Sequence, residues 1–234
     1  MRILVLGAGK TGKLVAEVAA ERGHSVHVLD ASENKDAAAL TAPFVTRFDV
    51  AIDFTTPDAA VPNMQACLAN GVRMVIGTTG WYDKLPDMQA LAVRRGTGLL
   101  YGTNFSIGMQ LMLELSKKMT ATLMDSGYTF SIDETHHLSK LDSPSGTALT
   151  LRDAVISTIG LDKDGEQPEV VIHANRTGDI EGIHTLIATG SCDRIILTHE
   201  ARSRRPFADG AVRAAEWLSK QTGVYEFCEV FKKF

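Results

Sequence analysis

The sequence has too few cysteines for a disulfide framework. Cys67, Cys192 and Cys228 are its only three, and they lie far apart without any Cys-x-x-Cys pair. That pattern is typical of reduced thiols in a cytosolic protein and excludes a cysteine-based zinc site. Long apolar runs are also missing: none approaches the length of a membrane-spanning helix, and the apolar run at the start is too short for a signal peptide. We therefore expect a cytoplasmic protein that does not bind membranes.

A strong positive charge is absent as well. The 24 Lys and Arg residues are outnumbered by 28 Asp and Glu residues, which gives a net charge of −4. Such a chain has no general attraction to nucleic acid, although the local cluster of Arg202, Arg204 and Arg205 could serve a small anionic ligand. The hydrophobic content of 44% is ordinary for a globular protein, and 234 residues suffice for one large domain or two small ones.

The start of the chain has the pattern of a dinucleotide-binding fold. Residues 2–6 form a short apolar run typical of a buried strand, and residues 13–22 have helical spacing. Between them lies the motif Gly7-Ala8-Gly9-Lys10-Thr11-Gly12, and a second predicted strand, residues 24–29, ends at Asp30. Strand, G-x-G-x-x-G, helix, strand and acid is the order that such folds require. A plain strand-to-helix turn would explain the glycines alone but not this complete context.

Each part of this motif has a physical role. Gly7 permits a tight turn, Gly9 lets a pyrophosphate approach the backbone, and Gly12 lets the helix pack closely on the strand. The phosphates would then lie at the helix N-terminus, where free amides favour anions. Asp30 would accept hydrogen bonds from the adenosine ribose, and its charge opposes a 2′-phosphate. We therefore expect NADH and NADPH as cofactors, with NADH used at least as well.

Short strands alternate with helices up to about residue 101. Strands are predicted at residues 49–54, 73–76 and 99–101, and helices at 57–70 and 83–95, whereas 31–47 shows no clear pattern. This alternation predicts a doubly wound parallel sheet of Rossmann type.

The loops at the ends of these strands are further candidate cofactor contacts. They are Gly77-Thr78-Thr79 and Gly102-Thr103-Asn104-Phe105. We expect Thr55, Thr78 and Asn104 to face the nicotinamide, although each could instead stabilise a turn.

The second half changes character. It has predicted helices at 106–123 and 145–159, with strands at 128–134, 169–175, 180–189 and 194–202. These elements predict a second α+β domain with an open, mixed or antiparallel sheet, whose uncovered face favours oligomerisation. A final helix, 207–220, could return to the first domain. The expected class is thus α/β, with residues 1–104 and 208–234 binding the dinucleotide and residues 105–207 binding substrate and forming the oligomer.

Reactive side chains gather between residues 134 and 148. His136 and His137 are adjacent and Lys140 follows in a loop, a combination suited to acid–base chemistry near neutral pH. Pro144-Ser145-Gly146-Thr147 then opens the next helix. Its hydroxyls could simply cap that helix, but free amides at a helix start also bind carboxylates. No metal site is expected.

The string ETHHLSKLDSPSGTA, residues 134–148, resembles the signature of the dihydrodipicolinate reductases of lysine and diaminopimelate biosynthesis. The likeness extends over nearly the whole chain: GAGKTG, DFTTP, GTTGW and GTNFSIG resemble the family's cofactor loops, and RTGDIEGIHT and SRRPFADGAVRAAEWL its later strands and final helix. Two departures are Gly102-Thr103 in place of Ala-Pro, and a short span from Asp30 to Asp49 that suggests a trimmed strand-helix unit near the adenosine.

The resemblance implies a function and an assignment of residues. His136 would be the proton donor or acceptor and Lys140 the proton donor, while His137 and Gly146-Thr147, with Ser145, would hold the substrate. The reaction would be the NAD(P)H-dependent reduction of 4-hydroxy-tetrahydrodipicolinate, a cyclic dicarboxylate, to tetrahydrodipicolinate by a homotetramer. The alternatives are a dehydrogenase of another amino or imino acid, such as aspartate or diaminopimelate, and a non-catalytic nucleotide sensor.

Overall fold

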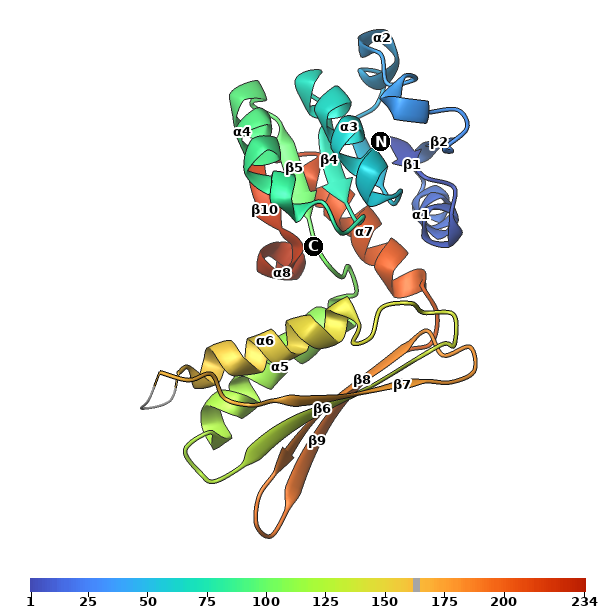
Figure 1. The fold of residues 1–234 in the computed structure, drawn as a ribbon. Helices are drawn as coiled ribbons and strands as arrows, with labels where there is room; N and C mark the ends of the chain where they lie inside the picture. Colours follow the sequence, from blue (N-terminus) through green and yellow to red (C-terminus); the bar gives the residue numbers. More distant parts are fainter. Residues whose placement is uncertain (162–164) are drawn as a thin grey trace. The chain divides into compact units, whose positions relative to one another are not determined.

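A computed structural model of the chain describes residues 1–161 and 165–234. The chain divides into two compact units, one formed by Met1–Ile107 with Arg204–Phe234 and the other by Gly108–Ser203 (Figure 1). Among the described residues, no helix is long and apolar enough to cross a membrane.

The first unit is built on a six-stranded parallel sheet with the order β10-β5-β4-β3-β1-β2. β1 pairs with both β2 and β3, so the chain reverses its direction of progress across the sheet at β1. The strands are β1 (Arg2–Leu6), β2 (Ser25–Leu29), β3 (Val50–Asp53), β4 (Arg73–Ile76), β5 (Gly98–Tyr101) and β10 (Gly223–Glu226).

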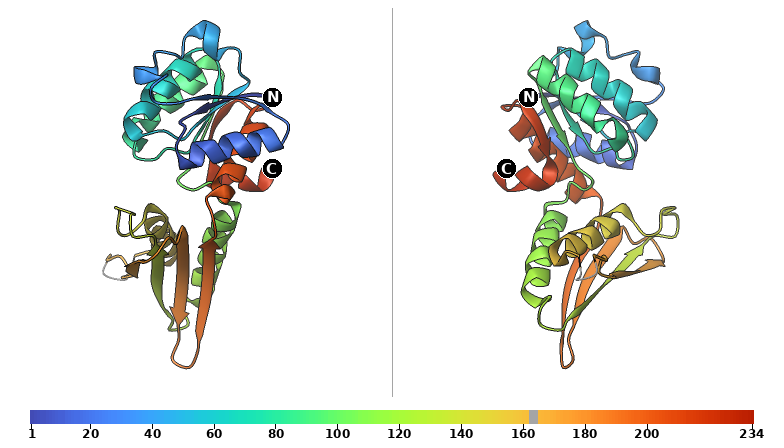
Figure 2. Two further views of the ribbon diagram at one scale, coloured as in Figure 1. Left: turned by 90° about the vertical axis from the view of Figure 1, so that its right-hand side faces the viewer. Right: turned by 60° about the vertical axis from the view of Figure 1, so that its left-hand side comes forward.

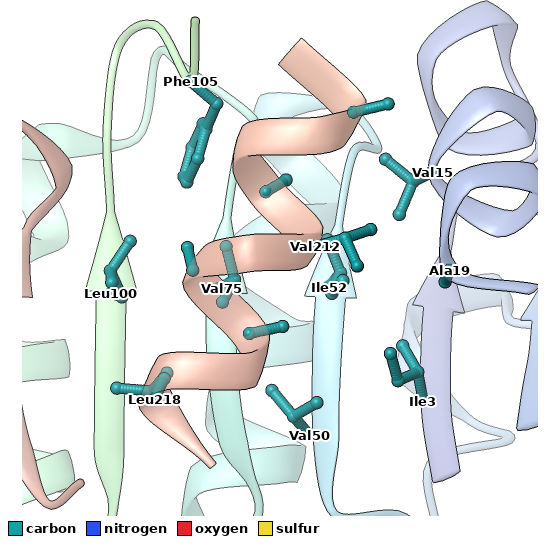
Figure 3. Close-up of a cluster of buried hydrophobic side chains, with 14 of the residues drawn as sticks. Ile3, Val15, Ala19, Val50, Ile52, Val75, Leu100, Phe105, Val212 and Leu218 are labelled. Carbon is teal, nitrogen blue, oxygen red and sulfur yellow. The ribbon is translucent and has the colours of Figure 1, made fainter. Parts of the chain in front are cut away.

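Helices cover both faces of this sheet, and the alternation of strand side chains separates the two cores. Ile3 and Val5 point into the core under α1 and α7, whereas Leu4 and Leu6 point into the core under α3 and α4. Figure 3 shows α7 crossing the strands, with Val212 and Leu218 directed at them. The helices are α1 (Lys10–Glu21), α2 (Ala42–Val45), α3 (Pro57–Ala69), α4 (Leu85–Arg95), α7 (Arg205–Leu218) and α8 (Phe227–Val230), with 3-10 turns at Lys35–Ala37, Tyr82–Lys84 and Phe231–Lys233.

The second unit is a four-stranded sheet with two helices on one face (Figure 2). Its order is β7-β6-β8-β9; β6 pairs parallel with β7, and the other pairings are antiparallel. Apolar side chains of α5 and α6 pack on alternate residues of β6 and β8. The elements are α5 (Ile107–Leu123), β6 (Thr129–His136), α6 (Gly146–Ile159), β7 (Val171–Arg176), β8 (Gly182–Thr189) and β9 (Arg194–Ala201).

The structure confirms the predicted fold class, a doubly wound parallel sheet plus a second domain with a mixed sheet. The last predicted helix does return to the first unit, as α7 packed against α1. β10 and α8 were not predicted, and α1 begins at Lys10 instead of residue 13. Residues 31–47 contain two short helical turns and no strand, so β2 is an edge of the sheet.

Gly210 provides a test of how tightly α7 is packed. A Cβ atom at this position would lie 1.8 Å from the carbonyl oxygen of Phe105. In an unconstrained helix, Gly→Ala stabilises by about 1 kcal/mol. Because the overlap outweighs that gain, we expect Gly210→Ala to lower the free energy of unfolding by about 1–3 kcal/mol. Equilibrium urea unfolding would measure the change, and an unchanged or higher free energy would contradict the close packing.

Candidate active site

The glycine loop between β1 and α1 leaves space only at its middle glycine. A Cβ atom on Gly12 would lie 1.9 Å from the carbonyl oxygen of Gly7. Gly7 has a φ of +100°, and a Cβ there would lie 2.3 Å from the carbonyl oxygen of Phe54. At Gly9, which is the N-cap of α1, a Cβ would meet nothing within 4 Å. The outer glycines thus fix the turn, and the backbone at Gly9 stays accessible to a ligand at the helix N-terminus.

Two cavities share this loop, and Gly9 lines both. One, of about 410 Å³, is lined mainly by loop residues of the first unit: Gly9, Lys10, Thr11, Phe54, Thr55, Pro57, Gly77, Thr78, Thr79 and Arg204. The other, of about 360 Å³, includes Gly7, Ala8, Asp30, Asn34 and Lys35. The structure thus brings together the predicted cofactor residues of the glycine loop, the Gly77–Thr79 loop and Asp30. Two adjacent cavities at a helix N-terminus fit the phosphates and sugars of a dinucleotide.

Asp30 lies at the C-terminal end of β2 and organises the turn that follows. Its Oδ1 accepts hydrogen bonds from the Ser32 hydroxyl at 2.6 Å and from the backbone amides of Ser32 and Glu33 at 2.8 and 3.0 Å. The Ser32 hydroxyl and these amides lower the pKa of Asp30, so the half-buried carboxylate is an anion at neutral pH. A fixed negative charge at this place suits a ribose diol better than a phosphate.

Asp53 is a buried carboxyl group in the same region that the sequence patterns did not single out. Its Oδ1 accepts hydrogen bonds from the hydroxyls of Thr55 and Thr78, each at 2.7 Å, and its Oδ2 accepts one from Asn63 at 2.8 Å. Burial raises its pKa against these hydrogen bonds. The hydroxyls expected to face the nicotinamide are therefore bonded to Asp53, and they hold the two loops together beside the larger cavity.

The Gly102–Phe105 loop does not line either cavity within the described residues. The Asn104 side chain accepts a hydrogen bond from the Ser106 amide at 2.8 Å, which stabilises the turn before α5. Phe105 is buried against Phe227, with ring centroids 4.5 Å apart. These two contacts are structural ones in the first unit, and the role of the loop toward a cofactor stays a prediction.

In the second unit, side chains of β6 alternate between the two faces of the sheet, and this alternation places Glu134 and His136 on the buried face. Phe130 and Ile132 join the apolar core, and the next two residues with the same orientation are Glu134 and His136. Glu134 is fully buried and His136 is 6% exposed. Glu134 is paired with His184 of β8, which faces the same side. The polar end of this face lies beside the start of α6, because Glu134 accepts a hydrogen bond from the Ser145 amide at 3.0 Å.

Glu134 has partners on four segments: its own strand β6, the start of α6, β7 and β8. Its Oε1 accepts hydrogen bonds from the Ser145 amide and from Arg176 Nη2, both at 3.0 Å. Its Oε2 lies 3.2 Å from His136 Nδ1 and 3.8 Å from His184 Nε2. Burial raises the pKa of Glu134, but the hydrogen bonds of Ser145 and Arg176 outweigh it and hold the pKa below its ordinary value. Glu134 is therefore an anion in this site.

Burial acts in the opposite direction on the two histidines. It lowers the pKa of His136, and Glu134 partly opposes that shift, whereas Lys140 and Arg176 add to it. Burial together with the neighbouring His136 lowers the pKa of His184 to about 4, so His184 is neutral near pH 7. His136 is consequently the member of the pair that can change its charge nearest to neutral pH.

The loop after β6 holds Lys140 near the start of α6. Lys140 Nζ lies 2.8 Å from Asp142 Oδ1, so the lysine is paired with a carboxylate of its own loop. Burial acts to raise the pKa of Asp142, but Lys140 and the Gly146 amide lower it below its ordinary value. Lys140 and the helix start thus already share one carboxylate, which is the type of group that a dicarboxylate substrate would present. His137, also half-buried, lies 2.9 Å from the Ser139 hydroxyl through its Nδ1.

The start of α6 has the predicted helix cap. Ser145 is 2% exposed, and its hydroxyl accepts the hydrogen bond of the Ala148 amide at 3.1 Å, so it is the helix cap. Gly146 is exposed and Thr147 is half-buried at the first two helical positions. Amides in the first turn of a helix lie outside its internal hydrogen-bond ladder and attract anions, and the Gly146 amide already acts on Asp142.

Glu134, Arg176 and His184 were missed by the sequence analysis. Arg176 and His184 lie on β7 and β8, so only the sheet brings them to Glu134. One signal was available: Glu134 and His136 continue the buried phase of the alternation in residues 128–134. One possible metal-ligand atom from each of Glu134, His136 and His184 lies within 4.8 Å of the other two, a spacing that could hold a cation. The Arg176 guanidinium on Glu134 opposes one.

Comparisons with known proteins cover both units. A family model described as "Dihydrodipicolinate reductase, N-terminus" matches residues 1–105, and one described as "Dihydrodipicolinate reductase, C-terminus" matches residues 108–231. A 4-hydroxy-tetrahydrodipicolinate reductase of Christiangramia forsetii is 36% identical over 98% of this chain and 97% of its own length. One of Natronomonas pharaonis is 38% identical over 97% of this chain and 98% of its own length.

A solved structure has the same fold. It is described as a dipicolinate-bound dihydrodipicolinate reductase of Paenisporosarcina sp. TG-14, with a TM-score of 0.79 and 24% identity over 98% of this chain and 99% of that one.

Alanine at two glycines of the loop should separate cofactor binding from folding. We expect Gly9→Ala, which meets no neighbouring atom, to leave the free energy of unfolding within about 1 kcal/mol and to weaken dinucleotide binding by about tenfold or more. Gly12→Ala should instead destabilise the first unit by about 1–3 kcal/mol, because its Cβ overlaps Gly7. Urea unfolding and NADH fluorescence titration measure both effects. Equal loss of stability in the two variants would contradict the assignment.

Proposed function

Because the chain belongs to the dihydrodipicolinate reductase family, we propose that the end of β6 and the start of α6 form its substrate site. The activity is that of the family, NAD(P)H-dependent reduction of 4-hydroxy-tetrahydrodipicolinate in lysine and diaminopimelate biosynthesis. One observation carries the proposed site: Glu134 bonds the Ser145 amide and lies 3.2 Å from His136. The candidate proton carrier and the candidate carboxylate-binding helix start are thus held by one side chain.

The proposed ligand is a cyclic dicarboxylate. The Paenisporosarcina structure contains dipicolinate, which is a planar ring with two carboxylates. In this chain, the amides of Gly146 and Thr147 would bind one carboxylate at the N-terminus of α6. His137 and Lys140 would supply further donors, with Lys140 released from Asp142. Ser145 would contribute by fixing the helix start, since its hydroxyl already caps α6.

The dinucleotide, when bound, supplies the hydride that reduces the ring. The glycine loop would hold its phosphates at the N-terminus of α1, and Asp30 would accept hydrogen bonds from the adenosine ribose. Thr78, Thr79 and the loop of Asn104 and Phe105, with Gly102 and Thr103, would border the nicotinamide. The open space at Gly9 and the two adjacent cavities support this arrangement.

The proton that accompanies the hydride would come from His136 or Lys140. His136 lies at the end of β6 with a carboxylate behind it, and Lys140 lies in the following loop as a cation. Both groups are suited to general acid catalysis, and either order of action is compatible with their positions. The other side chains of the site would hold the carboxylates in place during the transfer.

We further propose a homotetramer formed through the open face of the second sheet. The helices cover one face, and the other carries apolar side chains on its central and edge strands. Ile196 of β9 is 50% exposed and pairs with Ile187 of β8. An exposed apolar strand face of this kind is typical of an association surface.

The roles of His136 and Lys140 can be tested in an assay coupled to the synthase that makes the substrate. We expect His136→Gln and Lys140→Met each to lower kcat by about 10²-fold or more, because each removes a proton carrier. The KM for NADH should change little, since both residues belong to the second unit.

Two variants are matched controls: His27→Gln, at an exposed position of β2, and Lys118→Met, at an exposed position of α5. Both should keep normal turnover. Near-normal kcat in both test variants would reject the assignment. Complete absence of NAD(P)H oxidation by the wild-type chain would instead favour a nucleotide sensor.

Cofactor preference tests the role of Asp30. We expect the wild-type kcat/KM with NADH to equal or exceed that with NADPH, because the ionised Asp30 repels a 2′-phosphate. Asp30→Asn removes that charge and should improve the ratio of NADPH to NADH by about tenfold, with Lys10 and Lys35 of the cavities still present. Kinetics with both nucleotides in parallel measure the ratio. A strong wild-type preference for NADPH would contradict the assignment.

A further inference from the structure

We propose that Glu134 is the positioning residue of the site: it fixes the ring of His136 so that Nε2 faces the substrate. The inference deepens the proposed function and rests on it. Glu134 touches neither ligand in this arrangement and acts through His136. Its place is unusual, because a fully buried carboxylate is costly unless it is neutralised and hydrogen-bonded.

Glu134 orients the imidazole of His136. His136 Nδ1 lies 3.2 Å from Glu134 Oε2, and both atoms are buried without another hydrogen-bond partner. An Nδ1–H group directed at this carboxylate satisfies both atoms. The second nitrogen, Nε2, then lies on the side of the ring away from Glu134, where it can exchange a proton.

Space is left beside Nε2 of His136. Gly182 of β8 lies there, and a Cβ atom at this residue would come within 3.0 Å of His136 Nε2 and 3.3 Å of its Cδ2. The φ of Gly182 is not positive, so its backbone conformation does not require glycine. Because Gly182 has no side chain, none crowds the Nε2 edge of the buried ring. This observation is independent of the contacts of Glu134.

The negative charge of Glu134 acts on His136 through one carboxylate oxygen. Arg176 on β7 and the Ser145 amide at the start of α6 donate to Oε1, so Oε2 remains available to His136. His184 on β8 lies 3.8 Å from Oε2 and is neutral near pH 7. Lys140 and Asp142 of the following loop also act on His136, with opposite signs. Of these groups, Glu134 is the anion in contact with the ring, and it stabilises the imidazolium.

The proton balance follows from this geometry. Protonated His136 carries N–H groups at both ring nitrogens, donates the Nε2 proton to the reduced substrate, and keeps the Nδ1 proton directed at Glu134. The neutral ring is then a single tautomer, with the lone pair on Nε2 ready to take a proton from water. Without the carboxylate, the ring could also hold its proton on Nε2 and present the wrong nitrogen.

Glu134→Gln tests the proposal, because the amide keeps an acceptor for Ser145 but loses the charge. We expect the pKa of His136, measured by NMR in the ligand-free protein, to fall. Activity that needs protonated His136 is lost as pH rises through this pKa, so the descending limb of kcat against pH should move to lower pH. At pH 7, kcat should fall on the order of 10²-fold, with the KM for NADH unchanged. Glu134→Asp should restore part of both losses.

Glu169→Gln is the matched control, since Glu169 is an exposed carboxylate just before β7, and it should leave both measurements at wild-type values. An unchanged His136 pKa and pH profile in a folded Glu134→Gln variant would overturn the proposal. If that variant does not fold, Gly182→Ala decides. It leaves Glu134 intact and covers Nε2, so kcat should fall at every pH, and wild-type turnover would overturn the proposal.

His136→Gln separates the failure of this inference from the failure of the proposed function. Normal turnover in His136→Gln would reject the proposed role of His136 itself. Low turnover in His136→Gln, combined with a wild-type pH profile in Glu134→Gln, would reject only the role of Glu134.

Discussion

The site in the second unit depends on one buried negative charge. Removing the Glu134 carboxylate from water costs several kcal/mol, about as much as a whole network of ordinary hydrogen bonds returns. The fold meets this cost with donors from three segments: His136 on the same strand, Arg176 on β7 and the Ser145 amide at the start of α6. Each donor must be in place for the charge to be tolerated. Satisfying the carboxylate therefore also assembles the histidine, the helix start and the strand that frames them.

Strand alternation explains why this assembly needs no special backbone. Phe130 and Ile132 point into the core, and Glu134 and His136 continue the same phase for four more residues of one strand. Packing of Phe130 and Ile132 in the core fixes the register of β6. The same register then places Glu134 and His136. A shift by one residue would turn Glu134 and His136 to the opposite face together with the core residues. The stability of the core thus protects the position of the reactive groups.

The same alternation shows how far the sequence could predict this site. The pattern of residues 128–134 predicted the strand, and the family signature identified His136, Lys140 and the start of α6. Neither pattern gave a role to Glu134, because glutamate is rarely buried and the local sequence contains no sign of its partners. Its partners Arg176 and His184 follow 42 and 50 residues later and meet it only through the sheet. In the first unit, β10 was missed for a related reason: four residues without an apolar run become a strand only by pairing with β5.

The two buried carboxyl groups of the chain show what distinguishes a structural acid from one that can act on a neighbour. Asp53 receives hydrogen bonds from neutral groups, two threonine hydroxyls and an asparagine amide, and burial raises its pKa. Glu134 has Arg176 and a helix-start amide, and its pKa is lowered although it is equally buried. Neutral donors hold two loops in place, but at Asp53 they do not offset the effect of burial on the pKa. At Glu134 a cationic partner on one oxygen helps to keep the pKa low, and it leaves the other oxygen for the imidazole. The arginine, more than the depth of burial, is therefore what lets a carboxylate in this core control a histidine.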